Sequence, residues 1–421
     1  MEHSVAIADR AEKVIARCKR LASVSEVRGS TCRTFLSIAM RECYRVVGDW
    51  MEAAGAEVTI DAAGNLRGFY SAAQTAAPRL LLGSHLDTVP NAGAYDGVLG
   101  VVLAVSLLET LGGRKLPFAI EVIGFSEEEG IRFGTPFIGS RALAGKLDDE
   151  LLDQKDTNGV TVRTAIENFG LKPAEISRAA MSTDSLAYVE FHIEQGPVLE
   201  SLGIPLGVVE GIAGQTRGEF ILLGRANHAG TTPLNLRHDA MSAAAEWILE
   251  VERVAKREKG LVATVGRIAA TPNAANVVAG EVRVSLDVRH KSNDVRARAA
   301  EFLAVQAEEI AHRRGLTMAR KILLNQSAVA MDPFLMDQIE QAAGEAGCKT
   351  HRMVSGAGHD AMILADKIPA GMIFLRTPGG VSHHPSESVS VEDVAKAIEC
   401  GTLLLTQLAA SAEFQKRMVR A

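Results

Sequence analysis

"RLLLGSH" (79–85), "DGVLGVVLAVSLLETLGG" (96–113) and "FAIEVIGF" (118–125) follow one another along the chain and decide the fold. The first and third segments are short apolar runs, as buried strands are, and the second has the length of a helix closed by Gly-Gly. Strand, helix and strand at this spacing predict a βαβ unit in a mostly parallel mixed sheet that is flanked by helices. A further buried strand is expected at "IPAGMIFL" (368–375). The fold class is therefore α/β.

The middle of the chain has a different order of predicted helices and strands. A strand, a long amphipathic helix, two strands, a second helix and a last strand are expected, which is the β-α-β-β-α-β order of a ferredoxin-like domain. Its main segments are 216–225, 236–260, 280–290, 294–314 and 316–326. We predict an inserted α+β domain over 214–329, and a first domain formed by 1–213 and 330–421.

The composition is that of a soluble globular protein. The chain has 421 residues, is 47% hydrophobic and carries a net charge of −6. Such a mildly acidic chain has no basic footprint for nucleic acid, and it has no apolar run of about 18 residues that would predict a membrane span. The first 21 residues are expected to form an amphipathic helix and not a signal peptide. The five cysteines are odd in number and lack CxxC spacing, so free thiols and a cytoplasmic location are expected.

Histidines and carboxylates gather where the predicted strands end or where glycine-rich loops begin. The residues concerned are His85, Asp87, Asp96, Glu127, Glu128, Glu129, His192 and the pair His383-His384. Ligands collect at the carboxyl ends of strands in such sheets, and imidazole with carboxylate suits Zn²⁺ or Mn²⁺. A lone histidine or an acidic triplet is more often structural or solvated, but the set together favours a metal centre. Neighbouring Glu128 and Glu129 can share one site only if the backbone turns, as Gly130 permits.

Several motifs resemble the amidase/hydantoinase/carbamoylase family of dinuclear-metal hydrolases, which is related to aminoacylases and glutamate carboxypeptidases. They include "GSHLDTVPNAGAYDGVLGV", "SEEEGIRFG", "HIEQGPVLE", "NHAGTTPLNLRHDA", "PNAANVV", "SGAGHDAM" and "GGVSHHPSE". The resemblance implies a zinc-exopeptidase-like catalytic domain with an inserted lid and dimerisation domain. It implies hydrolysis of the ureido C–N bond of an N-carbamoyl-L-amino acid to the amino acid, ammonia and CO₂.

Other functions stay open on the same motifs. Allantoate amidohydrolase and β-ureidopropionase would use the same machinery, and Ala92 and Ala94 depart from the residues that relatives often carry beside Asp96. An aminoacylase or dipeptidase is disfavoured by "HIEQGPVLE" and "NHAGTTP". A non-catalytic ligand-binding homologue would be favoured by loss of a ligand or of Glu128, and all of them are present.

The resemblance also implies a division of roles at the metal centre. His85 and His192 would bind one ion, Glu129 and His383 the other, and Asp96 would bridge them. The ions would be two divalent cations per subunit, Zn²⁺ or Mn²⁺, with Co²⁺ or Ni²⁺ as alternatives.

Four further residues beside the centre receive roles in the same way. Asp87 would orient the imidazole of His85 from the second shell, and Glu128 would be the general base. Glu127 is expected to point away or to lie on the surface. His384 is a neighbour of the site.

The substrate side is assigned by the same resemblance. Arg289 would clamp the substrate carboxylate with Asn276 as its amide partner, and Gln195 would reach toward the ureido group. His228 would stabilise the oxyanion from the other subunit of a homodimer. The loop residues expected to line this side are Gly356, Gly358 and His359.

Overall fold

The computed structural model describes residues 2–420 and divides into two compact units. The large unit comprises Met1–Glu210, Met331–Met353 and Gly358–Ala421, and the small unit comprises Gly211–Ala330 and Val354–Ala357. The small unit contains the range 214–329 that the sequence predicted as an insertion, and adds a short later segment. Its roles as a lid and in dimerisation stay predictions.

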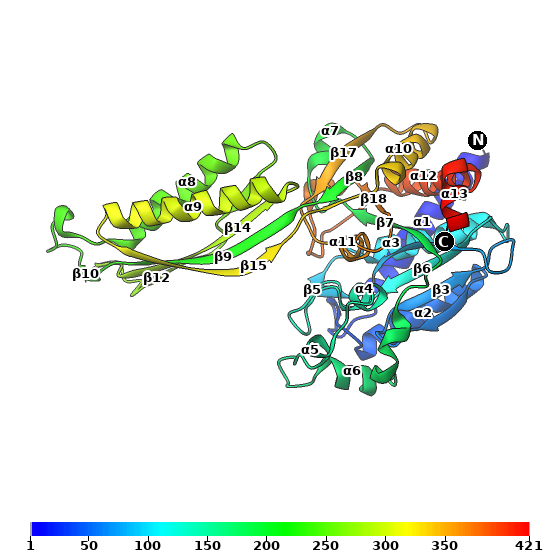
Figure 1. Ribbon diagram of the computed structural model, residues 1–421, viewed down its shortest axis with the longest axis horizontal. Coiled ribbons are helices and arrows are strands. Elements are labelled where there is room, and N and C mark those ends of the chain that lie inside the picture. The colour runs from blue at the N-terminus through cyan, green and yellow to red at the C-terminus, as the bar shows by residue number, and fades with distance from the viewer. Residues whose placement is uncertain (1, 421) are drawn as a thin grey trace. The chain divides into compact units, whose positions relative to one another are not determined.

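A nine-stranded mixed sheet forms the core of the large unit, in the order β16-β8-β18-β7-β4-β6-β3-β2 with β17 paired to β8 (Figure 1). The four central strands β18, β7, β4 and β6 are parallel, and their flanking neighbours are antiparallel. The strands are β2 (Glu57–Ile60), β3 (Leu66–Tyr70), β4 (Arg79–His85), β6 (Ala119–Phe125), β7 (Ser185–Ile193), β8 (Leu206–Ile212), β16 (Val329–Ala330), β17 (Thr350–Ser355) and β18 (Ala370–Leu375). The predicted βαβ unit is confirmed, since β4 and β6 pair in parallel on either side of the helix α3.

Helices cover both faces of this sheet. Helix α3 (Val98–Leu111) packs on β4 and β7 and contacts α1 (Glu2–Ala22) and α12 (Val391–Ala410). Gly100 allows α3 to approach closely, because a Cβ there would lie 2.1 Å from the backbone oxygen of Phe191.

Helix α11 (Asp360–Leu364) lies on the opposite face, where the backbone N–H of Ala361 donates to Glu190 of β7. The remaining elements of the unit are β1 (Thr31–Arg33), α2 (Ile38–Ala53), β5 (Thr88–Ala92), α4 (Ile138–Leu143), α5 (Asp149–Leu152), α6 (Val162–Asn168), η1 (Pro173–Ala179), α7 (Val198–Leu202), α10 (Pro333–Glu345), η3 (Pro378–Gly380) and α13 (Ala412–Arg420).

The small unit is an antiparallel sheet in the order β11-β14-β9-β15, with β12 also paired to β14, and two helices on one face. Its elements are β9 (Gly214–Leu223), β10 (Asn227–His228), η2 (Leu234–Leu236), α8 (Ala240–Arg257), β11 (Val262–Thr264), β12 (Ile268–Thr271), β13 (Val277–Val278), β14 (Glu281–His290), α9 (Asn293–Arg313) and β15 (Thr317–Gln326). The predicted β-α-β-β-α-β order is present. Helix α8 begins later than expected because the carboxylate of Asp239 caps it, accepting from the N–H groups of Met241 and Ser242.

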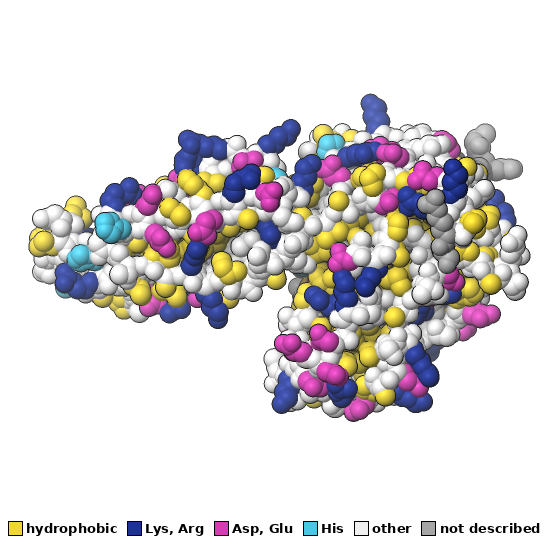
Figure 2. All heavy atoms as spheres, viewed as in Figure 1, with side chains coloured by type: hydrophobic (Ala, Val, Ile, Leu, Met, Phe, Trp, Pro, Cys, Tyr) yellow, Lys and Arg dark blue, Asp and Glu magenta, His cyan; other side chains and the backbone are white. Residues whose placement is uncertain are grey.

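Surface and cysteine chemistry agree with the composition. Acidic and basic side chains are interspersed on the face shown in Figure 2. The five cysteines are free thiols, as predicted, and four of them are buried. Across residues 2–420, none of the helices is long and apolar enough to cross a membrane.

Candidate metal centre

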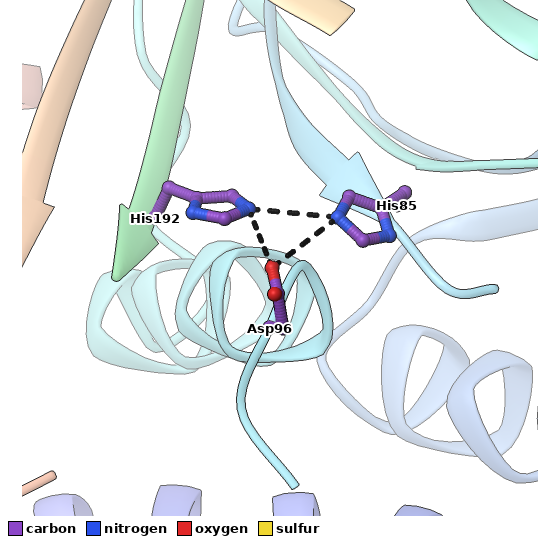
Figure 3. Close-up of side chains that lie close together, drawn as sticks. All are labelled: His85, Asp96 and His192. Atoms are coloured by element: carbon purple, nitrogen blue, oxygen red, sulfur yellow. Dashed lines mark hydrogen bonds and ion pairs between the residues drawn. The ribbon is translucent and has the colours of Figure 1, made fainter. Parts of the chain in front are cut away.

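Three buried side chains meet where β4, β7 and the start of α3 come together (Figure 3). His85 ends β4, His192 lies near the end of β7, and Asp96 precedes α3. One oxygen of Asp96, Oδ1, lies 3.2 Å from Nε2 of His192 and 3.7 Å from Nε2 of His85. The two Nε2 atoms are 3.5 Å apart, so all three groups converge on one point. Their ligand atoms could hold one metal ion.

The second oxygen of Asp96 faces another group. Oδ2 lies 3.2 Å from Nε2 of His383, and that nitrogen lies 3.4 Å from Oε1 of Glu129. These three residues form a second possible ligand group. A carboxylate with one oxygen in each group has the geometry that a bridging ligand requires.

Backbone carbonyl groups fix the orientation of the two imidazole rings in the first ligand group. Nδ1 of His85 lies 3.0 Å from the backbone oxygen of Asp87, and Nδ1 of His192 lies 2.9 Å from the backbone oxygen of Ile193. A ring that donates from Nδ1 to a carbonyl leaves Nε2 as the free lone pair. Both Nε2 atoms are therefore prepared to bind a metal.

Asp87 does more than the sequence predicted for it. Its carboxylate lies 3.6 Å from Nδ1 of His85, farther than its own backbone oxygen. Each carboxylate oxygen accepts a backbone N–H at 3.0 Å, one from Glu128 and one from Glu129. Asp87 thus holds the turn that carries the two glutamates, a contact between residues more than forty positions apart that sequence spacing could not reveal.

The glutamate turn begins three residues before the glycine that the sequence indicates. The sequence pointed to Gly130, whose φ is indeed +67°, but Glu127 also lies in the left-handed region with φ +51°. That conformation costs about 1 kcal/mol for a residue with a Cβ. The reversal lets Glu128 and Glu129 face the same centre: Oε2 of Glu128 lies 3.9 Å from Nε2 of His85, and Glu129 lies beside His383.

Glu127 is fully buried, so of the two predicted alternatives the surface placement is wrong, and the side chain points away from the ligand groups. Its carboxylate accepts N–H groups from Phe35, Arg132 and Phe133. Burial and then the charge of Asp87 raise the pKa of Glu127, while the three N–H groups oppose this rise because they stabilise the charged carboxylate. The side chain points into the protein because these amides are the partners available there.

The centre holds more carboxyl groups than imidazoles. The buried or nearly buried acids around it are Asp87, Asp96, Glu127, Glu128, Glu129, Glu190, Asp360 and Glu387. Burial and then the neighbouring Glu129 raise the pKa of Glu128, and burial and then Glu190 raise that of Asp360. Such crowding of negative charge favours bound cations.

The neighbouring carboxylates also shift the pKa values of two histidines. Burial opposes the charged form of His192, but the hydrogen bond and charge of Asp96 outweigh it and raise its pKa to about 9. Hydrogen bonds to Asp96 and Glu129 raise the pKa of His383 to about 10. A nitrogen and oxygen donor set with excess negative charge fits Zn²⁺ or Mn²⁺.

Two residues that sequence reasoning missed hold the loop of Asp96. Oε1 of Glu387 accepts the N–H groups of Tyr95 and Asp96 at 2.8 and 3.0 Å. The hydroxyl of Ser382 donates to Oδ2 of Asp96 at 2.7 Å. Both belong to "GGVSHHPSE", but only the fold brings that segment to Asp96.

Gln195 also contacts Asp96, whereas the family resemblance predicts that its side chain reaches toward the ureido group of the substrate. Its side-chain nitrogen donates to Oδ2 of Asp96 at 2.8 Å, and its Oε1 is buried with no hydrogen-bond partner among the described residues. An unpaired buried acceptor is costly, so a donor on a bound molecule would stabilise it.

His359 lies next to the first ligand group. It is 1% exposed, and its ring centroid is 4.5 Å from that of His192. Burial and then the charge of His192 lower its pKa well below the usual range. Gly358 leaves room for the ring of Phe137, which a Cβ would approach to 2.8 Å. Glu190, which the sequence did not single out, completes a third possible ligand group with these two histidines.

Arg289 lies on the helix-free face of the small unit beside Asp287. Its Nε and Nη2 donate to the Asp287 carboxylate at 2.8 and 2.9 Å, and its Nη1 donates to the backbone oxygen of Gly356 at 2.6 Å. A guanidinium has five N–H groups, so two stay available for a second anion.

His228 and Asn276 lie together at another place in the small unit. They belong to the loops around β10 and β13, joined by the N–H of Ala229 to the oxygen of Asn276 at 2.9 Å. Arg289 pairs with Gln215 at the start of β9, whereas these loops follow its end at Leu223. That span of β9 measures about 26 Å. Arg289 and Asn276 are therefore not partners within one chain, contrary to the simplest form of the prediction.

Several known proteins are similar to this chain over most of its length. The model for "Peptidase family M20/M25/M40" matches residues 81–407. The chain is 39% identical over 388 residues to an N-carbamoyl-L-amino acid amidohydrolase of Geobacillus stearothermophilus, covering 90% of this chain and 95% of the relative. It is 38% identical over 417 residues to allantoate deiminase 2 of Glycine max, covering 91% and 86%. A crystal structure of an amidase of the hydantoinase/carbamoylase family from Burkholderia multivorans superimposes with a TM-score of 0.89 at 30% identity, covering 94% and 97%.

Proposed function

The chain belongs to peptidase family M20/M25/M40, and we propose that it hydrolyses the ureido C–N bond of an N-carbamoyl-L-amino acid, with two divalent ions at its centre. The products are the L-amino acid, ammonia and CO₂. The observation that carries the proposal is the position of Asp96, one oxygen of which faces His85 and His192 while the other faces His383.

The ligand assignment follows these two groups. His85 and His192 would hold one ion, Glu129 and His383 would hold the other, and Asp96 would contribute one oxygen to each. Ions bound there would lower the pKa of an attacking water and polarise the carbonyl of the substrate. Zn²⁺ and Mn²⁺ suit the donors best, with Co²⁺ and Ni²⁺ as alternatives.

Glu128 is the general base in this mechanism. It takes a proton from the attacking water, and the new C–O bond forms at the carbamoyl carbon. It then returns the proton to the leaving nitrogen as the C–N bond breaks. The burial of its carboxyl suits the role of a base, because burial raises the pKa of Glu128 and so makes its carboxylate a stronger proton acceptor.

His228 has the tautomer that oxyanion stabilisation needs. Its Nδ1 accepts the N–H of Gly230 at 3.1 Å, which leaves the proton on Nε2. The ring is exposed and can donate from Nε2 to a negative oxygen on the substrate. We assign this donor role to His228.

The substrate carboxylate binds to the two remaining N–H groups of Arg289. Asn276, Gln195 and the loop of Gly356, Gly358 and His359 complete the substrate contacts. Arg289 pairs with the start of β9, and His228 belongs to the loops that follow the end of β9, so we infer that a single centre takes them from two different chains. The proposal thus includes a homodimer, located in the cytoplasm.

The second candidate is allantoate amidohydrolysis, because relatives with that name match at nearly the same identity. Ammonia release decides between the two. The assay offers N-carbamoyl-L-amino acids, N-carbamoyl-β-alanine and allantoate to the enzyme loaded with Zn²⁺, Mn²⁺, Co²⁺ or Ni²⁺. Higher kcat/KM for a carbamoyl amino acid supports the first function, preference for allantoate supports the second, and no ammonia from any of them rejects both.

A further inference from the structure

Glu127 accepts more backbone N–H groups than the single oxygen of a glutamine in its place could accept. Its Oε1 accepts from Arg132 at 2.6 Å and from Phe133 at 3.3 Å, and its Oε2 accepts from Phe35 at 3.1 Å. The side chain is fully buried, so water does not share these donors. Three N–H groups therefore converge on two oxygens of one residue.

This arrangement needs a carboxylate. The donors approach from two sides, one side to each oxygen, and only a carboxylate accepts at both. An amide in its place would turn its NH₂ group toward one of the two sides. Donor would then face donor, and at least one buried N–H would lose its partner.

The three donors tie separate segments to the glutamate turn. Phe35 comes from the loop before α2, and Arg132 and Phe133 follow the turn itself. The guanidinium of Arg132 also donates to the backbone oxygen of Phe35 at 2.7 Å, so the two segments are joined twice. These hydrogen bonds thereby attach the turn to a part of the large unit that carries none of the proposed metal ligands.

Asp87 completes the mounting from the other side. It accepts the N–H groups of Glu128 and Glu129, while the hydrogen bonds to the side chain of Glu127 hold the preceding residue in place. The backbone of 127–129 is thus held at both ends. Glu127 has a left-handed backbone conformation, and the hydrogen bonds on both sides of the turn are needed to keep it.

We propose that Glu127 is a positioning residue, whose carboxylate fixes the backbone that presents Glu128 to the substrate and Glu129 to the metal. The inference rests on the proposed function, because it assigns the two neighbours their roles there. Glu127 itself touches none of the reacting atoms.

The test compares Glu127→Gln with the wild type as metal-loaded full-length protein. The substitution keeps the size of the side chain and removes one acceptor. We expect kcat to fall by about 10- to 100-fold, as small displacements of a catalytic group do, with KM changed by less than about twofold. Deuterium exchange should become at least about tenfold faster at one or more of the amides of Phe35, Arg132 and Phe133, because a glutamine cannot accept from both sides.

Asp332→Ala is the matched control. Asp332 caps α10 by accepting the N–H of Leu335 and lies outside the proposed centre, so its loss lowers stability without touching the turn. We expect wild-type kcat for it and unchanged exchange at the turn. A third variant, Glu128→Asp, already displaces the base, so adding Glu127→Gln to it should cost less than about threefold in kcat.

Three results would overturn the proposal: kcat of Glu127→Gln within about twofold of the wild type, an equal loss in Asp332→Ala, or unchanged exchange at the three amides. The exchange measurement does not depend on turnover. If the wild type hydrolysed no ureido compound, the proposed function would fail, and exchange at the turn would still decide whether Glu127 holds it.

Discussion

The carboxylate of Asp87 and the backbone of Glu128 are joined by a hydrogen bond of 3.0 Å, and the other oxygen of Asp87 accepts the N–H of Glu129 at the same distance. Asp87, two residues after the β4 histidine His85, therefore controls the turn at the end of β6. Because β4 and β6 are parallel neighbours, both ends meet at one edge of the sheet. This contact couples the geometry of His85 to that of the proposed base.

Asp87→Asn should impair both the base and the second metal position. An asparagine has one acceptor oxygen, so one of the two turn amides is left unpaired at a cost of about 1–3 kcal/mol. We expect kcat to fall by about 100-fold and the bound metal to drop below the wild-type stoichiometry. Elemental analysis with steady-state kinetics checks this. Asp366→Asn, which removes only an exposed pair with Lys146, should behave as wild type; full activity and metal content in Asp87→Asn would contradict the prediction.

Glu128→Ala should abolish turnover and leave the protein folded. Loss of a general base costs about 10²–10⁴ in kcat. The thermal midpoint should stay level or rise, because the substitution removes a buried carboxyl from a crowd of like charges. Metal content is expected to stay that of the wild type. Activity close to wild type would refute the assignment of the base.

Metal removal should destabilise the large unit. Cations that bind only the folded state stabilise it by about 2.7 kcal/mol at a concentration of 100 times Kd. Dialysis against a chelator is expected to lower the thermal midpoint, and addition of Zn²⁺ or Mn²⁺ to restore it. The double variant His85→Ala/His192→Ala should respond more weakly. An identical midpoint with and without chelator in the wild type would exclude the metal centre.

Mixing two inactive variants should restore activity if His228 acts across a dimer. Glu128→Ala supplies an intact His228, and His228→Ala supplies an intact base. Random reassortment makes about half of the dimers mixed, each with one complete centre, so about a quarter of wild-type activity is expected. The assay is ammonia release after unfolding and refolding the mixture. Activity no higher than that of the separate variants would place His228 and its centre in the same chain.

The ion pair of Asp287 and Arg289 should stabilise the small unit at neutral pH, and this stabilisation should be lost in acid. Burial raises the pKa of Asp287, but hydrogen bonds from Arg289 and Arg217 outweigh it and hold the pKa below its usual value. A lowered folded-state pKa means that the stabilisation is present above the unfolded value of about 3.9 and is lost as the pH falls through the folded value.

The variant Asp287→Asn measures this contribution. We expect it to be less stable than the wild type by about 0.5–1 kcal/mol at neutral pH, with the difference closing below about pH 4. Urea unfolding at a series of pH values checks it. A constant difference down to about pH 2 would show that the loss comes from packing and not from the charge.

Much of the fold follows from local pattern. The strand at 79–85, the helix after Asp96 and the strand at 118–125 are set by apolar runs of the right length and by the closing glycines. The β-α-β-β-α-β order of the small unit follows from periodicity in the same way. The start of α8 was placed too early, because capping by Asp239 decides it and amphipathic pattern does not show a cap.

The sequence by itself determined which residue types stand at the ends of the strands, and therefore that a histidine and carboxylate centre was expected at one edge of the sheet. Only the tertiary structure decided how they meet. Asp96 touches His383, Ser382 and Gln195, which lie 99 or more positions away along the chain. Glu127, which no pattern separates from its two neighbours, is turned inward because three unpaired amides lie there and a buried amide must find an acceptor.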